Sequence, residues 1–262
     1  MEFLSERSSR VVAYAKLLRA PGRRAQEQFL VEGSNAVSAA IATGHAQTVL
    51  LRDPERHDQI VAAAGAAGLS VIGLSERAAQ KLSEASTPPG VFAVCRLLDA
   101  NLDAVLAAGP RLVAVAIEPR EPGNAGTLIR TADAMGADAV LLLGDSVDPH
   151  NGKSVRASAG SVFHLPIVRE RDIDTTLRRL QDEGLVLLAT TADGELSLDE
   201  AAGVLSHRTA WLFGNEAHGL PTPIVNVADH RVSIPIRGRA ESLNLATAAA
   251  ICLYESARVQ NR

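Results

Sequence analysis

The stretch WLFGNEAHGL, residues 211–220, indicates more clearly than any other how this chain folds. An apolar run stops at Gly214, and amide, carboxylate and imidazole side chains follow before a second glycine, Gly219. Polar residues on a loop held by a buried strand are typical of ligand sites in open α/β sheets. Gly214 also permits a close backbone approach to a ligand. The alternative interpretation is a Gly-Asn turn with a capping glutamate and no further role.

A second segment of this kind lies upstream, where the apolar run LVAVAI, residues 112–117, leads into EPREPGNAGTLIRTADAM, residues 118–135. An uninterrupted apolar run predicts a strand that is covered on both faces. We expect a helix from Asn124 to Met135, with Asn124 as its N-cap. At 100° per residue Arg130 points away from the apolar stripe of this helix and is free to contact an anion. An ordinary surface arginine is the alternative.

The third segment, IPIRGRAESLNLATAA, spans residues 234–249. A strand ends at a proline, a basic loop follows, and Ser242 or Asn244 starts the last helix. The unpaired amides and positive dipole at such a helix start suit a carboxylate or phosphate, although a well-capped helix would look the same. A weaker segment, NGKSVRASAGS at residues 151–161, places Lys153 and Arg156 on a helix start and could hold phosphate.

Helix-like and strand-like segments alternate along the whole chain, which predicts an α/β fold. We expect a small first domain over residues 1–98, a linker over 99–110 and a second domain over 111–262. In the first domain a helix should cover 5–18 and end before Pro21-Gly22. The strands expected are 29–31, 48–51, 70–72, 91–95, 112–117, 139–143, 185–189, 210–213 and 232–234, followed by a final helix over 243–258.

Composition limits the class of protein. Hydrophobic residues make up 47% and charged residues 21% of the 262 residues, as in soluble globular proteins. No apolar run reaches the roughly 18–20 residues of a membrane span, and the acidic N-terminus does not resemble a signal peptide, so we expect a cytoplasmic protein. The two cysteines, Cys95 and Cys252, lie far apart, and no His/Cys spacing suggests zinc, so we expect no metal.

The formal net charge of −4 argues mildly against nucleic acid as a partner, but binding needs only a local basic patch. Six arginines and lysines lie within the first 24 residues, and Arg19, Arg23 and Arg24 end this run. A solvated helix face is the alternative. Aromatic residues make up only 3%, which argues against extensive base stacking.

Taken together, the segments resemble the SpoU/TrmH family of the SPOUT methyltransferases. The resemblance covers roughly residues 112 to 258, and three motifs in the family's order are far more specific than any one of them. The matching residues are Asn124-x-Gly126-x-x-x-Arg130, Arg156-Ala157-Ser158-x-Gly160-Ser161, Phe213-Gly214-Asn215-Glu216-x-x-Gly219-Leu220, and Ile234-Pro235 with Ser242-Leu243-Asn244. The first domain is similar to the L30e-like RNA-binding domain that often precedes this catalytic domain, with much less specific motifs.

The resemblance implies a C-terminal parallel-sheet domain tied in a trefoil knot, although generic topology rules disfavour knots. It also implies a homodimer built through that domain and S-adenosylmethionine as cofactor. The cofactor would bind along residues Thr190, Leu212, Gly214, Ile234 and Leu243. The reaction implied is methyl transfer to a ribose 2′-hydroxyl of ribosomal or transfer RNA.

For catalysis the resemblance implies Arg130, supported by Asn124, Glu216, Ser242 and Asn244. An arginine is a poor general base because its pKa lies above about 12. We therefore expect Arg130 to pair with the RNA phosphate and to stabilise the developing alkoxide. RNA would also contact the basic side chains of Arg19, Arg23, Arg24, Lys153 and Arg156.

Two other functions stay open at this stage. A non-catalytic RNA-binding protein, such as a ribosome assembly factor, would keep the fold, but the intact Arg130, Glu216 and Asn244 argue against it. A nicotinamide-dependent dehydrogenase is disfavoured because no GxGxxG follows a strand. Among RNA substrates, the extra N-terminal domain favours large-subunit ribosomal RNA over transfer RNA.

Overall fold

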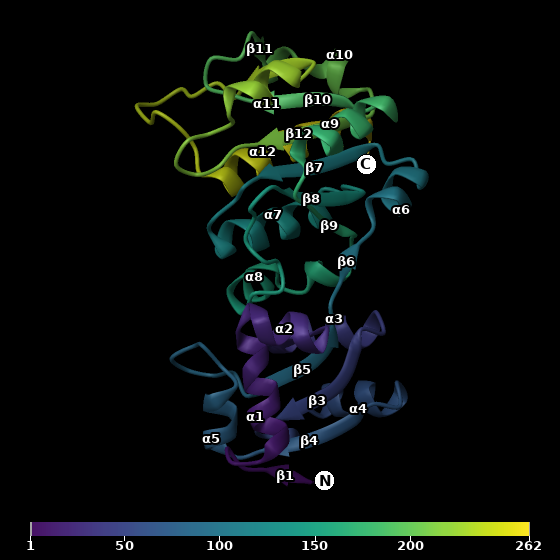
Figure 1. The fold of residues 1–262 in the computed structure, drawn as a ribbon, viewed down its shortest axis with the longest axis vertical. Coiled ribbons are helices and arrows are strands. Elements are labelled where there is room, and N and C mark those ends of the chain that lie inside the picture. The colour runs from purple at the N-terminus through teal and green to yellow at the C-terminus, as the bar shows by residue number, and fades with distance from the viewer. Residues whose placement is uncertain (1, 262) are drawn as a thin grey trace. The chain divides into compact units, whose positions relative to one another are not determined.

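The computed structural model describes residues 2–261, which form two compact units (Figure 1). The first unit contains the chain up to Leu98 together with residues 148–164, and the second contains residues 99–147 and the chain from Leu165 onward. The expected second domain over residues 111–262 differs from this division in two ways: the second unit already begins at Asp99, and residues 148–164 pack with the first unit. Residues 99–110 also differ from the expected linker, since they form strand β6 (Asp99–Ala100) and helix α6 (Leu102–Ala107) of the second unit.

The first unit is built on a mixed five-stranded sheet in the order β1-β4-β3-β5-β2. Strand β5 runs antiparallel to both of its neighbours, whereas β1, β4 and β3 are parallel. Helices α1 and α5 cover one face, and α3 and α4 pack together against the sheet. The strands are β1 (Phe3–Leu4), β2 (Gln28–Glu32), β3 (Ala46–Leu51), β4 (Ser70–Leu74) and β5 (Val91–Arg96), and the helices are α1 (Ser9–Ala15), α2 (Ala20–Gln26), α3 (Ser34–Ala42), α4 (Asp58–Ala66) and α5 (Glu76–Lys81), with 3₁₀ turns η1 (Lys16–Leu18) and η2 (Pro54–Arg56).

The expected helix over residues 5–18 is wrong at its start and confirmed at its end. Helix α1 begins only at Ser9 and continues into η1, which ends at Leu18; Arg19 is then extended before α2 begins. Pro21 does not end a helix; it lies in the first turn of α2. Proline is tolerated there because first-turn amides have no intrahelical acceptor.

Residues 148–164 are attached to the first unit by a buried ion pair. The side chain of Arg23 is 3% exposed, and its Nη2 and Nε donate to Asp148 Oδ2 at 2.7 and 2.9 Å. Its Nη1 donates to the carbonyls of Leu17 and Leu18. His150 accepts the Leu98 amide at Nε2, which leaves the Nδ1 proton for Asp148. Arg23 is therefore a structural residue, and the expectation that it contacts RNA is corrected.

Replacing Arg23 by alanine is expected to lower the free energy of unfolding by about 3 kcal/mol, because the partly buried Asp148 carboxylate loses its arginine and keeps only His150. Arg24→Ala is the matched control: Arg24 is exposed on the same helix and should change stability by about 0.5 kcal/mol or less. Urea unfolding of the two variants measures the difference. A loss below about 1 kcal/mol for Arg23→Ala would contradict the buried pair.

The same pair predicts acid sensitivity. Burial opposes ionisation of Asp148, but hydrogen bonds and charge from His150 and Arg23 outweigh it and hold its pKa well below its usual range. A depressed pKa contributes stability that is present above the unfolded-state pKa, about 3.9, and is lost as the pH falls below it. The parent protein should therefore lose stability in acid more steeply than a variant that lacks the pair.

The second unit is built on an eight-stranded sheet in the order β11-β13-β10-β12-β7-β8-β9-β6, and every pairing in it is parallel. This confirms the expected parallel-sheet domain. Besides β6 and α6, its elements are β7 (Leu112–Ile117), α7 (Pro122–Ala134), β8 (Ala139–Leu143), β9 (Ile167–Glu170), α9 (Ile173–Asp182), β10 (Val186–Thr190), β11 (Leu196–Ser197), η4 (Leu198–Glu200), α10 (Ala202–Leu205), β12 (Thr209–Phe213), α11 (Thr222–Val227), β13 (His230–Ser233) and α12 (Leu245–Gln260).

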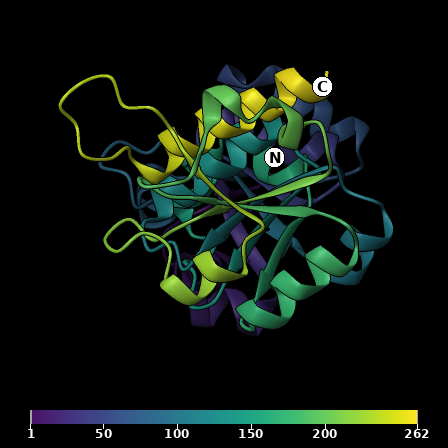
Figure 2. The ribbon, with the colours of Figure 1, turned by 90° about the horizontal axis from the view of Figure 1, so that it is seen from above.

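Helices cover both faces of this sheet, as Figure 2 shows for α12 on one side and α9 and α11 on the other. Alternate strand residues such as Val113, Leu187 and Leu212 form a core with α9 and α11. On the opposite face Trp211 is fully buried, and its indole N–H donates to Ser256 of α12 at 2.8 Å. Burial on both faces explains why the central strands are continuously apolar.

Residues 148–164 of the first unit contain α8 (Gly152–Ser158) and the turn η3 (Ser161–Phe163). No helix within residues 2–261 is both long enough and apolar enough to cross a membrane. The threading of α12 through an earlier loop, which the family resemblance implies, stays a prediction.

Candidate functional site

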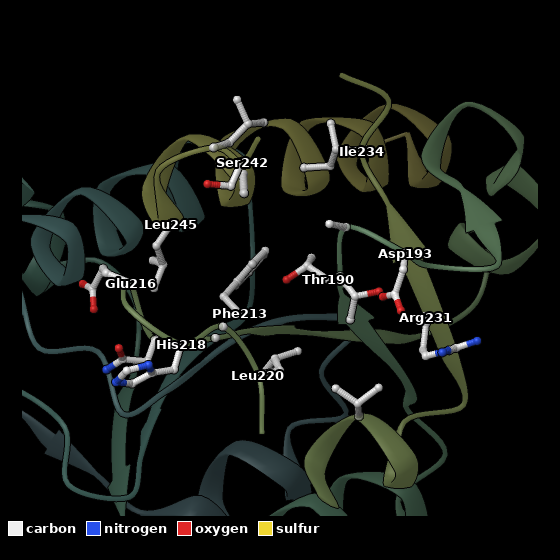
Figure 3. Close-up of a pocket in the computed structure, with 18 of the residues that line it drawn as sticks. Thr190, Asp193, Phe213, Glu216, His218, Leu220, Arg231, Ile234, Ser242 and Leu245 are labelled. Carbon is white, nitrogen blue, oxygen red and sulfur yellow. The ribbon is translucent and has the colours of Figure 1, made fainter. Parts of the chain in front are cut away.

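A cavity of about 830 Å³ lies in the second unit, where the neighbouring strands β13, β10 and β12 end (Figure 3). Its walls come from the segments that follow these strands and from the start of α12. The apolar lining is Phe213, Leu220, Val225, Ile234, Ile236, Leu243 and Leu245, and the polar lining includes Thr190, Thr191, Asp193, Asn215, Glu216, Ser242 and Asn244. A cavity of this size, lined by both apolar walls and polar groups, suits a small-molecule ligand.

The loop after β12 folds back on itself. Asn215 and Gly219 exchange two backbone hydrogen bonds of 3.0 and 2.9 Å, and Gly219 has a φ of +67°. A Cβ atom on Gly214 would lie 2.1 Å from the Gly219 carbonyl carbon and 2.3 Å from the Leu220 nitrogen. Gly214 is therefore required by its own loop, in addition to any approach of a ligand.

Three motif side chains form one hydrogen-bonded network at the start of α7. The Asn244 amide group donates to Asn124 Oδ1 at 3.0 Å, and Asn124 Nδ2 donates to Glu216 Oε1 at 2.9 Å. The Glu216 carboxylate also accepts the backbone amides of Arg120 and Glu121. Three segments far apart in sequence are thus tied together. Helix α7 begins at Pro122 with Glu121 as its N-cap, so the expected N-cap role of Asn124 is wrong.

The network keeps Glu216 ionised. Partial desolvation opposes ionisation, but the hydrogen bonds from Asn124 and from the two backbone amides outweigh it and lower the pKa of Glu216. An anionic side chain at a helix N-terminus is also favoured by the helix dipole. Asn244 meanwhile caps α12, because its Oδ1 accepts the amides of Ala246 and Thr247.

Arg130 lies on the exposed side of α7, as its helical position predicts. Its guanidinium forms no hydrogen bond or ion pair with another residue of the described chain, and it does not line the cavity. No hydrogen bond joins it to Asn124, Glu216 or Asn244 within residues 2–261 either. Arg130 is therefore available to an external anion.

Of the residues expected to bind a cofactor, Thr190, Gly214, Ile234 and Leu243 line the cavity, and Ser242 joins them. Leu212 does not line it: its side chain is fully buried in the core on the other face, and its carbonyl accepts the Thr190 hydroxyl at 2.8 Å. Thr191 and Asp193 also line the cavity, although no motif in the sequence marks them.

The five residues expected to bind RNA all lie in the first unit, where three are exposed and two form ion pairs with carboxylates. Arg19, Arg24 and Lys153 are exposed. Arg156 is partly exposed and pairs with the buried carboxylate of Glu32 at 2.9 Å, while Arg23 is buried as described above. No cluster of three or more potential metal ligands occurs among the residues that the structure describes.

A parallel α/β domain with a ligand cavity at its strand ends and a polar network beside it has the architecture of an enzyme that uses a small-molecule cofactor. Residues 111–254 match the model of the SpoU rRNA methylase family, and residues 9–93 match the MRM3-like substrate binding domain. The chain belongs to the SpoU rRNA methylase family.

Proteins of known sequence and structure resemble nearly the whole chain. The 23S rRNA (guanosine(2553)-2′-O)-methyltransferase RlmP of Bacillus subtilis is 34% identical, over 95% of this chain and 96% of its own length. The 23S rRNA (uridine(2479)-2′-O)-methyltransferase of Streptomyces viridochromogenes is 32% identical, over 97% and 91%. The AdoMet-bound rRNA methyltransferase structure from Sinorhizobium meliloti superimposes with a TM-score of 0.84 at 29% identity and covers 98% of both chains.

Proposed function

We propose that this protein transfers a methyl group from S-adenosylmethionine to a ribose 2′-hydroxyl of 23S ribosomal RNA. The observation that carries the proposal is the junction of the cofactor-sized cavity with the Asn244–Asn124–Glu216 network, formed by the family's three motifs. The two relatives named above methylate ribose hydroxyls of 23S rRNA, and they match this chain almost end to end.

The cavity fits such a cofactor. Its apolar walls suit an adenine ring, and its polar groups suit the ribose and the amino-acid part. The Thr191 hydroxyl is buried in the wall without a hydrogen-bond partner among the described residues, and a ligand could satisfy it. Ile234 and Leu243 face the cavity from opposite ends of the loop that joins β13 to α12.

The cofactor supplies an electrophilic methyl group, and the protein must align a ribose hydroxyl with it. Glu216 and Asn124 hold the start of α7 against the loop after β12, which fixes the edge of the cavity. Arg130, on the same helix, pairs with the RNA phosphate beside the reacting ribose. Its fixed charge favours loss of the hydroxyl proton by stabilising the developing alkoxide.

The first unit holds the RNA in this proposal, in keeping with its match to a substrate binding domain. Replacing Arg19 and Arg24 together by glutamine should weaken RNA binding and reduce the slope of log affinity against log salt by about 1–2, because each phosphate contact contributes about 0.9. Arg56→Gln, an exposed arginine of η2, is the control. Filter binding at several salt concentrations measures both quantities, and an unchanged slope would show that the two arginines only face solvent.

We further propose that the protein is a homodimer formed through its second unit. Ile251 and Tyr254, 37% and 58% exposed, lie one turn apart on the same face of α12, and neighbouring exposed apolar side chains of this kind suit a protein–protein contact. Ile251→Asp with Tyr254→Asp should give monomers by light scattering, whereas Val227→Asp on α11 should not. A parent protein that is monomeric at micromolar concentration would overturn this part of the proposal.

The function itself is tested by incubating the protein with radiolabelled S-adenosylmethionine and either 23S rRNA or transfer RNA. Label should enter 23S rRNA only. Label in transfer RNA alone would favour the alternative substrate, and cofactor binding without transfer to either RNA would favour a non-catalytic assembly factor.

A further inference from the structure

Asp193 places a carboxylate in the wall of the cavity, just after β10 (Figure 3). In Figure 3 it lies on the side of Thr190 away from Glu216 and His218. The side chain is exposed to the cavity and forms no hydrogen bond or ion pair with any other residue within the described chain. No motif of the sequence includes it.

The backbone next to Asp193 is closely held. A Cβ atom on Gly194 would lie 2.6 Å from the Ser233 nitrogen and 2.7 Å from the Val232 carbonyl carbon, so this segment rests directly on the end of β13. The Ser233 hydroxyl donates to the Gly194 carbonyl at 3.2 Å. Asp193 is therefore presented to the cavity by a fixed backbone.

Arg231, the positive charge beside Asp193, is already paired with Glu195. Arg231 donates from Nε to Glu195 Oε2 at 2.6 Å, and its backbone amide donates to Glu195 Oε1 at 3.0 Å. Hydrogen bonds from this arginine keep the pKa of Glu195 low, so the pair is formed at neutral pH. The Asp193 carboxylate thus keeps its full capacity to accept hydrogen bonds from a ligand.

We propose that Asp193 is a specificity-determining residue that accepts hydrogen bonds from the two ribose hydroxyls of the cofactor. The inference rests on the proposed function. A carboxylate offers two oxygens to two adjacent hydroxyls, and an acidic residue near the end of a parallel strand holds a ribose in the same way in dinucleotide-binding folds. In the proposed function the methyl group would face the Asn124–Glu216 edge, and Asp193 lies on the side of Thr190 away from that edge, where it would hold the ribose.

Calorimetry with two ligands tests the proposal. S-Adenosylhomocysteine contains both the ribose and the amino-acid part, whereas methylthioadenosine contains the ribose but lacks the amino acid. Asp193→Asn should weaken both ligands by the same factor, about tenfold or more, because a charge-assisted hydrogen bond is lost. Asp182→Asn removes the same charge from the exposed surface of α9 and should change neither affinity.

Each outcome decides a separate question. Equal loss for both ligands supports the ribose contact. Loss for S-adenosylhomocysteine alone would place the carboxylate at the amino-acid end and overturn the proposal, as would unchanged binding of both. Asp193→Glu keeps the charge on a longer side chain and should bind better than Asp193→Asn. If the parent protein binds neither ligand, the proposed function fails instead.

Discussion

Arg130→Ala is expected to lower the rate of methyl transfer by about 10²–10³-fold while the protein still folds and binds S-adenosylmethionine. The magnitude is that of removing one preorganised group that stabilises charge in a transition state. Stability should change by about 0.5 kcal/mol or less, because the side chain is exposed and contacts no other described side chain through a hydrogen bond or ion pair. Single-turnover methylation of 23S rRNA, beside thermal melting, measures both effects.

Two further variants sharpen this result. Arg130→Lys should also be slow, because a point charge does not replace the planar guanidinium at a phosphate. Arg178→Ala removes an exposed arginine from α9, on the other face of the sheet, and should leave the rate unchanged. Near-parent turnover by Arg130→Ala would refute the mechanism, and failure to fold would make Arg130 structural.

Gly214→Val is expected to abolish detectable cofactor binding. The added side chain begins with a Cβ atom 2.1 Å from the backbone of Gly219, so the loop after β12 must open and the cavity wall is lost. The strand itself ends before this position, and the unit should still fold. Calorimetry with S-adenosylhomocysteine and circular dichroism together separate lost binding from lost structure.

Gly219→Ala is the matched control for this variant. Gly219 has a positive φ, but a Cβ atom there meets nothing within 4 Å. The substitution should therefore cost only the strain of the left-handed conformation, about 1–2 kcal/mol, and keep most of the affinity. Parent-like affinity in a folded Gly214→Val protein would contradict the account of the loop.

The sequence predicts the second sheet well because its central strands are buried on both faces and read as unbroken apolar runs. It also predicts that Asn124, Glu216 and Asn244 belong to one site, although it places Asn124 at the helix cap. The hydrogen bonds among them depend on segments that are 92 and 120 residues apart, which only the fold brings together.

Other features depend on contacts that a local pattern cannot reveal. The burial of Arg23 follows from Asp148, which lies 125 residues further along the chain. Asp193 follows a strand in a polar stretch that resembles any surface turn, and it becomes part of the cavity because β10 lies between β13 and β12. The position of Leu212, in contrast, follows from the alternation of side chains along a strand. Phe213 lines the cavity, so Leu212 beside it points to the other side of the sheet, into the core.

Mass spectrometry of the nucleosides decides whether the chain methylates a ribose hydroxyl of 23S rRNA. 23S rRNA that lacks the modification is incubated with the protein and S-adenosylmethionine, digested and compared with a reaction that contains Arg130→Ala. We expect one added 2′-O-methylated nucleoside with the parent protein and almost none with the variant. A methyl group on a base, or equal products from the two proteins, would contradict it.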